Sequence, residues 1–394
     1  TLIAFTSFVA ILNAQNFTQV WRKTAQSGAS DFPWFTSTTN LVRTMTYNPV
    51  TDKVYVALSN AAIGQADTVY ILDANTGNRV GTLSKSGTGM GTEAFKHLRI
   101  RVANDGAIYS SSLSVTAGSF QRSKIYRWAS EADTATVSSI VTGERCGDVM
   151  SVVGTGVNTK IYLAGNSYAF DYSSPAVRDS TAQKIYVCTT VDGITFTKTD
   201  SIRLIAPLVS GRINWFKSLE AVSENILDGF WAKNFNHQAY KINVSGTPGA
   251  YVGSIGLSIT AGNGNGEVST AYGNVRYLVT PGNKKYLGFA GAFFTGIPAT
   301  ANTGVVMKMI DVTDEANLKT VGTDTLRGVN NTDTLLRNTT NTLGNGDVAY
   351  KFNGDGSYNV FYLITHNGVA CTRSATTLPV ELSKFTAQLV KNNV

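Results

Sequence analysis

The stretch that decides the fold is Thr44–Leu83, TMTYNPVTDKVYVALSNAAIGQADTVYILDANTGNRVGTL. It contains four short runs that are rich in Val, Ile, Leu, Tyr and Thr. The turn-forming segment Asn48–Lys53 separates the first two runs, and Asn75–Gly77 separates the last two. Runs of this kind between Asn, Asp, Gly and Pro are typical of antiparallel β-strands. The stretch therefore predicts one small four-stranded sheet.

The same unit recurs along the chain, and no copy shows a helical period. Its second strand recurs as VYVALS (54–59), AIYSSS (107–112), IYLAGN (161–166), GFWAKN (229–234), YLGFAG (286–291) and VFYLIT (360–365). Its third strand recurs as TVYILD (68–73), KIYRWA (124–129), KIYVCT (184–189), QAYKIN (238–243), VVMKMI (305–310) and GVACTR (368–373). Four-stranded units repeated around an axis form a β-propeller. Residues 16–377 are therefore predicted to form an all-β, six-bladed propeller, without the signatures of WD40 or kelch repeats.

The last copy lacks a fourth strand. It has runs at Asp347–Phe352, Val360–Thr365 and Gly368–Arg373, and Leu378–Pro379 follows soon after. An alternating run, Phe17–Thr24, precedes the first full unit. We expect this N-terminal run to supply the missing outer strand and to close the ring, which removes an exposed sheet edge.

Composition indicates an extracellular protein and excludes several functions. Charged residues make up 15% of the chain, and 33 basic against 26 acidic residues give a net charge of +7. The basic residues are dispersed, so no nucleic-acid partner is predicted. The three histidines lack metal-ligand spacing, so neither a metal nor a cofactor is expected. Cys146, Cys188 and Cys371 are expected to be buried thiols, with one disulfide as the alternative.

The N-terminal segment Thr1–Gln15 is uncharged and apolar, and it ends in Asn13-Ala14-Gln15. It resembles the apolar core and cleavage site of a secretory signal peptide. The alternative is a buried first strand. A membrane span is not expected, because the run is shorter than the roughly 20 residues that a bilayer requires. The mature protein is expected to begin near residue 15 or 16, outside the cytoplasm.

The C-terminal segment, residues 378–394, reads LPVELSKFTAQLVKNNV. It resembles the opening of the C-terminal sorting domain of type IX secretion cargo in Bacteroidetes. The family pattern continues with a Trp-bearing strand and a Thr-Ala-Ser-Glu-like segment, which these residues do not include. The resemblance implies the type IX secretion machinery as a partner, and export followed by release or attachment to the cell surface.

The same resemblance implies O-glycosylation, which Bacteroidetes carry out at Asp-(Ser/Thr) sequences in exported proteins. Several matches occur in this chain. The sites expected to be accessible are Ser180, Thr325 and Thr334.

Charged and aromatic residues recur where the innermost strand of each predicted blade begins. In a propeller these positions converge at the centre, so residues that are far apart in the sequence can meet there. A ring of cations would attract a carboxylate, sulfate or phosphate. The alternative is that these side chains only line a water-filled channel. The predicted ligand-binding residues are Arg43, His97, Asp148, Trp215, Lys217, Arg276 and Asp347.

No catalytic constellation stands out in the sequence. No spacing selects a pair of carboxylates for glycoside hydrolysis, and no Gly-x-Ser-x-Gly elbow occurs. The predicted function is therefore a non-catalytic binding or assembly module for an extracellular glycan or a surface protein. The long loops, on the face opposite the tight turns, are expected to carry the binding surface. The alternatives are an enzyme acting on extracellular polysaccharide and, last, a quinone-dependent dehydrogenase that uses His97.

Overall fold

The computed structural model describes residues 17–24, 32, 40–60, 67–86, 96–113, 122–142, 146–164, 184–205, 216–234, 239–259, 274–292, 305–325, 346–365 and 368–374. Within these residues the structure has twenty-four strands and, apart from two three-residue 3-10 turns, no helix. No helix in this part of the chain is long and apolar enough to cross a membrane. The predicted signal segment and sorting segment lie outside the described residues, as do most residues of the long loops.

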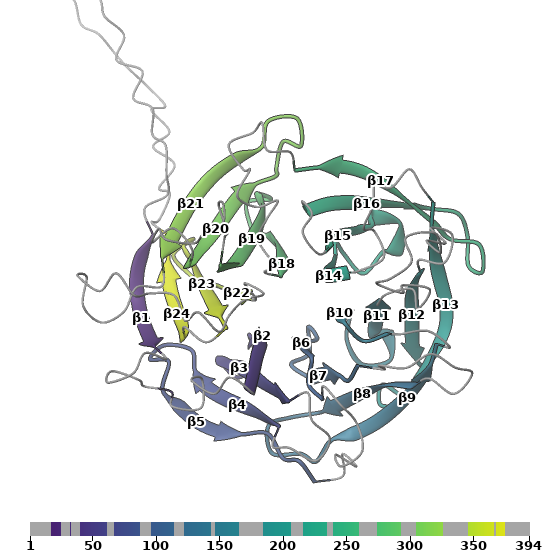
Figure 1. The fold of residues 1–394 in the computed structure, drawn as a ribbon, viewed down its shortest axis with the longest axis horizontal. Helices are drawn as coiled ribbons and strands as arrows, with labels where there is room; N and C mark the ends of the chain where they lie inside the picture. Colours follow the sequence, from purple (N-terminus) through teal and green to yellow (C-terminus); the bar gives the residue numbers. More distant parts are fainter. Residues whose placement is uncertain are drawn as a thin grey trace, which may run out of the picture.

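The strands form small antiparallel sheets arranged in a ring, as in a propeller (Figure 1). The first of these sheets contains β2 (Asn40–Asn48), β3 (Lys53–Asn60), β4 (Thr68–Asp73) and β5 (Arg79–Thr82). The next contains β6 (Arg99–Val102), β7 (Ile108–Ser111), β8 (Arg122–Trp128) and β9 (Thr136–Val141). Another contains β18 (Val275–Val279), β19 (Lys285–Ala292), β20 (Val305–Asp311) and β21 (Lys319–Thr325). In each sheet the first strand lies nearest the centre of the ring.

The prediction of six separate sheets is wrong at one point, because the third and fourth predicted units form a single eight-stranded sheet. Its first half contains β10 (Val149–Val153), β11 (Lys160–Ala164), β12 (Lys184–Thr190) and β13 (Phe196–Leu204). Its second half contains β14 (Phe216–Ala221), β15 (Phe230–Asn234), β16 (Ala239–Ser245) and β17 (Val252–Ser258). The structure therefore has four four-stranded sheets and one eight-stranded sheet.

The two halves are joined through their outer strands, β13 and β17, which pair in parallel at Arg203 and Leu204. Two backbone hydrogen bonds flank this pairing, from Arg203 to Tyr251 at 3.1 Å and from Ile205 to Gly253 at 2.8 Å. A Cβ atom at Gly253 would lie 2.6 Å from the Leu204 side chain. The absence of a side chain at Gly253 lets the two outer strands approach each other, which the repeat pattern alone does not reveal.

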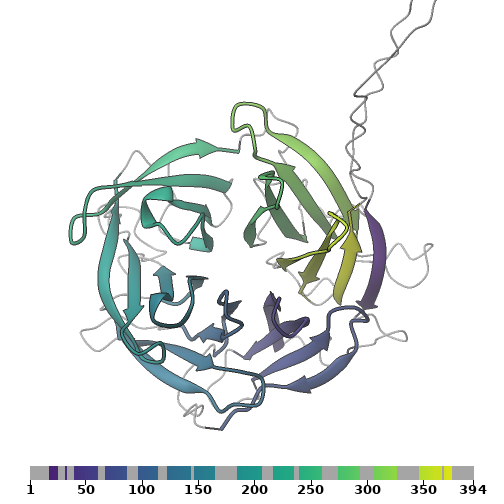
Figure 2. The same cartoon turned by 180° about the vertical axis from the view of Figure 1, so that it is seen from behind.

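The N-terminal strand closes the ring as predicted. β1 (Thr18–Thr24) pairs antiparallel with β24 (Gly368–Arg373), which continues through β23 (Tyr358–Ile364) to β22 (Gly346–Phe352). Both views of the ring show β1 beside β24 (Figures 1 and 2). A Cβ atom at Gly368 would lie 2.2 Å from the backbone oxygen of Lys23. This position therefore requires glycine for β1 to pair closely.

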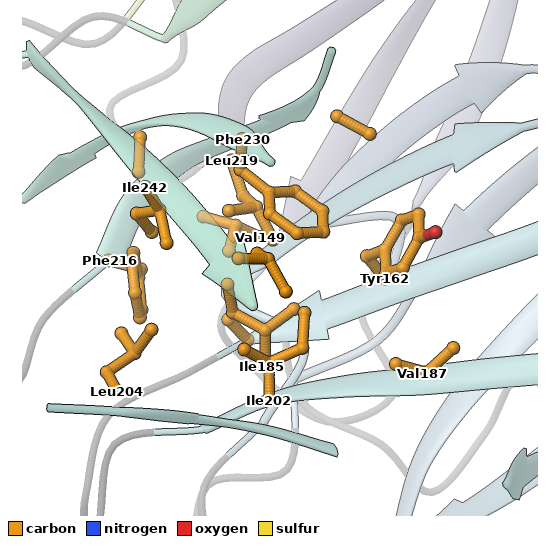
Figure 3. Packing of buried hydrophobic residues seen from close by; sticks show 14 of the residues in the cluster. Val149, Tyr162, Ile185, Val187, Ile202, Leu204, Phe216, Leu219, Phe230 and Ile242 are labelled. Atoms are coloured by element: carbon orange, nitrogen blue, oxygen red, sulfur yellow. The ribbon is translucent and has the colours of Figure 1, made fainter. Parts of the chain in front are cut away.

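The apolar core lies between neighbouring sheets. The cluster inside the eight-stranded sheet draws on both halves, with Tyr162 and Ile185 from the first and Phe216 and Phe230 from the second (Figure 3). The rings of Tyr162 and Phe230 pack edge to face, 4.8 Å apart at an interplanar angle of 80°. Each sheet therefore buries both of its faces, as ring packing requires. The three cysteines are buried and unbridged.

Hydroxyl groups tie the innermost strands of neighbouring sheets together. Thr44 on β2 accepts a hydrogen bond from the backbone of Ile100 on β6 at 3.2 Å. Ser151 on β10 accepts one from Ala221 at 2.9 Å, and Ser218 on β14 accepts one from Val275 at 2.8 Å. These bonds satisfy strand amides that would otherwise be buried without a partner, and they hold the centre of the ring in register.

Candidate functional site: a buried arginine cluster

Four arginines from three innermost strands converge at the centre of the ring. Arg43 lies on β2, Arg99 and Arg101 lie on β6, and Arg276 lies on β18. We call them the central arginine cluster.

Arg99 and Arg101 extend from β6 across the centre. The Arg99 guanidinium donates to its neighbour, the Leu98 carbonyl, and to the Lys217 carbonyl on β14, each at 2.9 Å. Arg101 donates to the Asp347 carboxylate on β22 at 3.2 Å, and its Nε lies 3.8 Å from the Glu220 carboxylate on β14. These contacts connect β6 with β14 and β22, two other innermost strands that surround the centre of the ring (Figure 1).

Asp347 holds the first and last sheets together. Its Oδ2 accepts hydrogen bonds from the Thr44 hydroxyl at 2.9 Å, the Met45 amide at 3.1 Å and Arg101 at 3.2 Å. Its Oδ1 accepts a bond from the Val348 amide at 3.0 Å. The side chain has no exposed surface. Asp347 thus uses both oxygens in contacts within the protein and presents neither of them to a substrate.

Glu220 lies between Arg101 and Arg276. Its Oε2 lies 3.2 Å from Arg276 Nη1, yet neither atom is aligned for a hydrogen bond. Burial raises the pKa of Glu220, while the charges of Arg276 and Arg101 act in the opposite direction. The Arg276 and Glu220 side chains keep 13% and 15% of their surface exposed. Arg276 and Glu220 are therefore partly exposed, as is Arg43, although Arg276 Nη1 and Glu220 Oε2 are themselves buried.

The cluster has unused hydrogen-bond donors and an excess of positive charge. Burial lowers the pKa values of Arg43 and Arg99 to about 10, with the Asp148 charge opposing this in Arg43, so both remain charged at neutral pH. Three carboxylates oppose the four arginines. Five guanidinium nitrogens have no hydrogen-bond partner within the described part of the chain: the Nε atoms of Arg43, Arg99, Arg101 and Arg276, and Arg276 Nη1. Buried donors without partners are costly, so an anion that accepted bonds from them would be stabilised.

The predicted site residues separate into three groups. Arg43, Arg276 and Asp347 lie in or against the cluster, and Lys217 contributes its carbonyl to it. Asp148 directly precedes β10, is buried, and acts on Arg43 and Arg99 through its charge. Trp215, Ser180 and Thr334 lie outside the described residues, and Thr325 is the last residue of β21.

His97 does not join the cluster. Its Nδ1 lies 2.7 Å from the Ser110 hydroxyl, and its ring packs against Tyr126 and Trp128 of β8. The side chain is buried, which lowers its pKa to about 4. His97 is therefore a neutral member of the sheet interior at physiological pH, and it offers no support for a histidine-dependent dehydrogenase. Among the described residues no group of His, Cys, Asp and Glu could hold a metal ion.

Sequence reasoning missed Arg101 and did not connect Glu220 with the arginines. A signal for Arg101 exists, because β6 reads Arg-Ile-Arg-Val and alternate residues of a strand share a face. Arg101 therefore points to the same side as Arg99. No comparable signal marks Glu220, since its role depends on two strands that are distant in the sequence.

Comparisons with known proteins agree with the propeller fold. No model of a known protein family matches the chain, and no curated protein matches it. A DUF4623 family protein from Bacteroides eggerthii is 16% identical over 92% of this chain and 76% of its own, with a TM-score of 0.56. A protein of unknown function from Dyadobacter fermentans is 11% identical, covering 91% and 98% of the two chains, with a TM-score of 0.51.

A microbial sialidase is also similar in structure, at 7% identity. The match covers 90% of this chain and 68% of the sialidase, with a TM-score of 0.51. At such low identities these likenesses show a shared all-β, propeller-like arrangement and no specific function.

Proposed function

We propose that this protein is an extracellular propeller that binds an anionic glycan, without catalysis, at the central arginine cluster. In this proposal each half of the eight-stranded sheet is one blade, so that these two blades and the four four-stranded sheets give six blades in total. The observation that carries the proposal is the set of five guanidinium nitrogens without hydrogen-bond partners among the described residues. A carboxylate or sulfate of a sugar would accept charge-assisted bonds from such donors.

The geometry favours binding over hydrolysis. A glycosidase needs two carboxyl groups that reach the scissile bond from opposite sides. Asp347 is fully buried and uses both oxygens within the protein. Of the other two carboxyl groups at the cluster, Asp148 is buried, and Glu220 faces Arg276.

Replacing Arg276 with methionine is expected to weaken binding to alginate, a carboxylate-rich polysaccharide, by at least about tenfold. Loss of one charge-assisted hydrogen bond costs about 1.5–3 kcal/mol, and about 1.4 kcal/mol is a factor of ten. Affinity electrophoresis of the full chain in gels containing alginate or neutral dextran would measure the change. Arg79→Met, at an exposed position on β5, is the matched control and should bind like wild type.

Three results would count against this function. Equal retardation of wild type and Arg276→Met in alginate would show that the cluster is not the binding site. Retardation of the wild type in dextran as strong as in alginate would show that binding does not depend on the anionic groups of the glycan. Release of oligosaccharides from alginate by the wild-type protein would replace the binding function with the enzymatic alternative.

The extracellular location is supported by the resemblance of residues 378–394 to a type IX sorting domain and by the apolar segment 1–15. In a host with type IX secretion, the protein is expected in the medium or on the cell surface. Its intact mass should exceed the sequence mass if Ser180, Thr325 or Thr334 carries sugar. Recovery from the cytoplasm, with an unmodified mass, would contradict both proposals.

A further inference from the structure

One face of the ring is built from the turns that join first to second and third to fourth strands. The structure describes all eleven of these turns between β2 and β23. Hydrogen bonds link them into one surface: Asn104 donates to Glu224 at 3.1 Å, and Thr51 donates to Glu131 at 2.8 Å. This turn face is opposite the long loops considered above, and the proposed glycan site does not use it.

Exposed apolar side chains gather on the turn face within the eight-stranded sheet. Val191 is 95% exposed, Val157 56%, Leu227 49% and Ile194 44%. We call these four residues the turn patch. They belong to three turns, those between β10 and β11, β12 and β13, and β14 and β15. Eleven large apolar side chains are exposed in the described part of the chain, and the patch holds four of them.

The turns that carry the patch are close together and held in place. A Cβ atom at Gly193 would lie 3.2 Å from the backbone of Gly156, so the first two turns touch. Lys160 donates to the Glu224 carbonyl at 3.0 Å and thereby ties the first turn to the third. Asp192 accepts backbone bonds from Ile194 at 2.8 Å and Thr195 at 2.7 Å. The patch is therefore preorganised, which lowers the entropic cost of docking a partner.

The turns around the patch are acidic, and the nearby cation is Lys160, the first residue of β11, which donates to the Glu224 carbonyl. The four turns of the eight-stranded sheet contain Asp192, Glu224 and Asp228 and no Lys or Arg. Over all eleven turns there are ten acidic residues and one basic residue, Lys284. This bias is opposite to that of the whole chain, whose net charge is +7. Within the described part of the chain, Asp192, Glu224 and Asp228 form no ion pair, and they accept hydrogen bonds from the neutral side chains of Thr190, Asn104 and Ser223.

We propose that the turn patch docks a basic segment of a partner protein, in which apolar side chains alternate with lysine or arginine. The apolar side chains of the segment would cover Val157, Val191 and Leu227. Its cations would lie beside Asp192 and Glu224. Such a rim of complementary charge steers a partner to an apolar centre. The occupant is a cationic partner and not a glycan, so the two faces of the ring would serve different ligands.

The test uses the full chain and a fluorescein-labelled peptide of alternating leucine and lysine, followed by fluorescence anisotropy. The triple variant Val157→Ser, Val191→Ser, Leu227→Ser should bind on the order of tenfold more weakly, because truncated apolar contacts at an interface centre dominate affinity. The matched control is Val80→Ser with Val141→Ser, at exposed positions on outer strands. It should bind like wild type. The unfolding temperature of each variant shows that the fold is intact.

Three outcomes would overturn the proposal. The first is no binding of the leucine–lysine peptide by wild type. The second is equal binding of a serine–lysine peptide, which would mean that charge alone acts. The third is wild-type self-association in light scattering that the triple variant abolishes, which would make a second copy of this chain the occupant.

Discussion

Replacing Asp347 with alanine is expected to lower the free energy of unfolding by about 3–5 kcal/mol, the usual cost of removing one partner of a buried ion pair. The carboxylate has no exposed surface and neutralises Arg101, whose side chain is 3% exposed. Its removal leaves that guanidinium charged in the interior and also frees the Thr44 hydroxyl and the Met45 amide. Because these contacts join the first and last sheets, the ring should open more readily. Urea unfolding followed by circular dichroism measures the change.

The control is an ion pair at the surface. Glu315→Ala removes the partner of Lys241, at 2.6 Å, where the two side chains are 45% and 24% exposed. Exposed pairs contribute about 0.2–1 kcal/mol, so this variant should unfold close to wild type. If both variants lowered the free energy of unfolding equally, burial of the Asp347–Arg101 pair would not increase its contribution to stability. Asp347→Asn tests the contribution of the charge separately from that of hydrogen bonding, because the side-chain amide oxygen can still accept a bond from the Met45 amide.

Replacing Lys233 with methionine is expected to stabilise the protein. Lys233 lies on β15, has no exposed surface, and its Nζ has no hydrogen-bond partner among the described residues. It shares a strand face with Trp231, which packs in the apolar cluster that contains Leu287 and Phe289. Burial lowers the pKa of Lys233 from its ordinary value of 10.5 to about 7. One pKa unit equals about 1.4 kcal/mol, so the buried ammonium costs on the order of 5 kcal/mol below pH 7.

The pH dependence follows from the same values. Between pH 7 and 10.5 the unfolded chain binds a proton at Lys233 that the folded protein does not, so the stability of the wild type rises with pH. Below about pH 7 both states are protonated and the penalty is complete. The advantage of Lys233→Met should therefore be large at pH 6.5 and small at pH 9.5 in urea unfolding. An advantage that did not shrink with pH would show that packing, and not charge, explains it. Lys319→Met, at an exposed position, should change stability by less than about 0.5 kcal/mol at either pH.

The strands and their order could be predicted from the sequence because their signals are local. TVYILD and GVACTR coincide with β4 and β24 residue for residue. Alternation of apolar residues and the turn chemistry of Asn, Asp and Gly act over a few positions, and each copy carries them. Counting strands in the last copy was also enough to assign the outer position to the N-terminal run, which pairs with β24.

Other features depend on residues that are distant in the sequence. The parallel contact between β13 and β17 requires Gly253 opposite Leu204. No local pattern separates this glycine from the others in the chain. Likewise, His97 and Arg99 are two residues apart, yet one packs into the sheet interior and the other reaches across the centre.

The sequence by itself determined that this chain forms small antiparallel sheets in a ring, closed by its N-terminal strand. Only the tertiary structure decided which charges meet. Arg101 and Asp347 are 246 residues apart, and they form a buried pair because closure of the ring places β6 and β22 around one centre. The burial of Lys233 likewise depends on the sheet that covers β15. The pattern that forms a strand is short-ranged, whereas burial and pairing of charge depend on every element that surrounds a side chain.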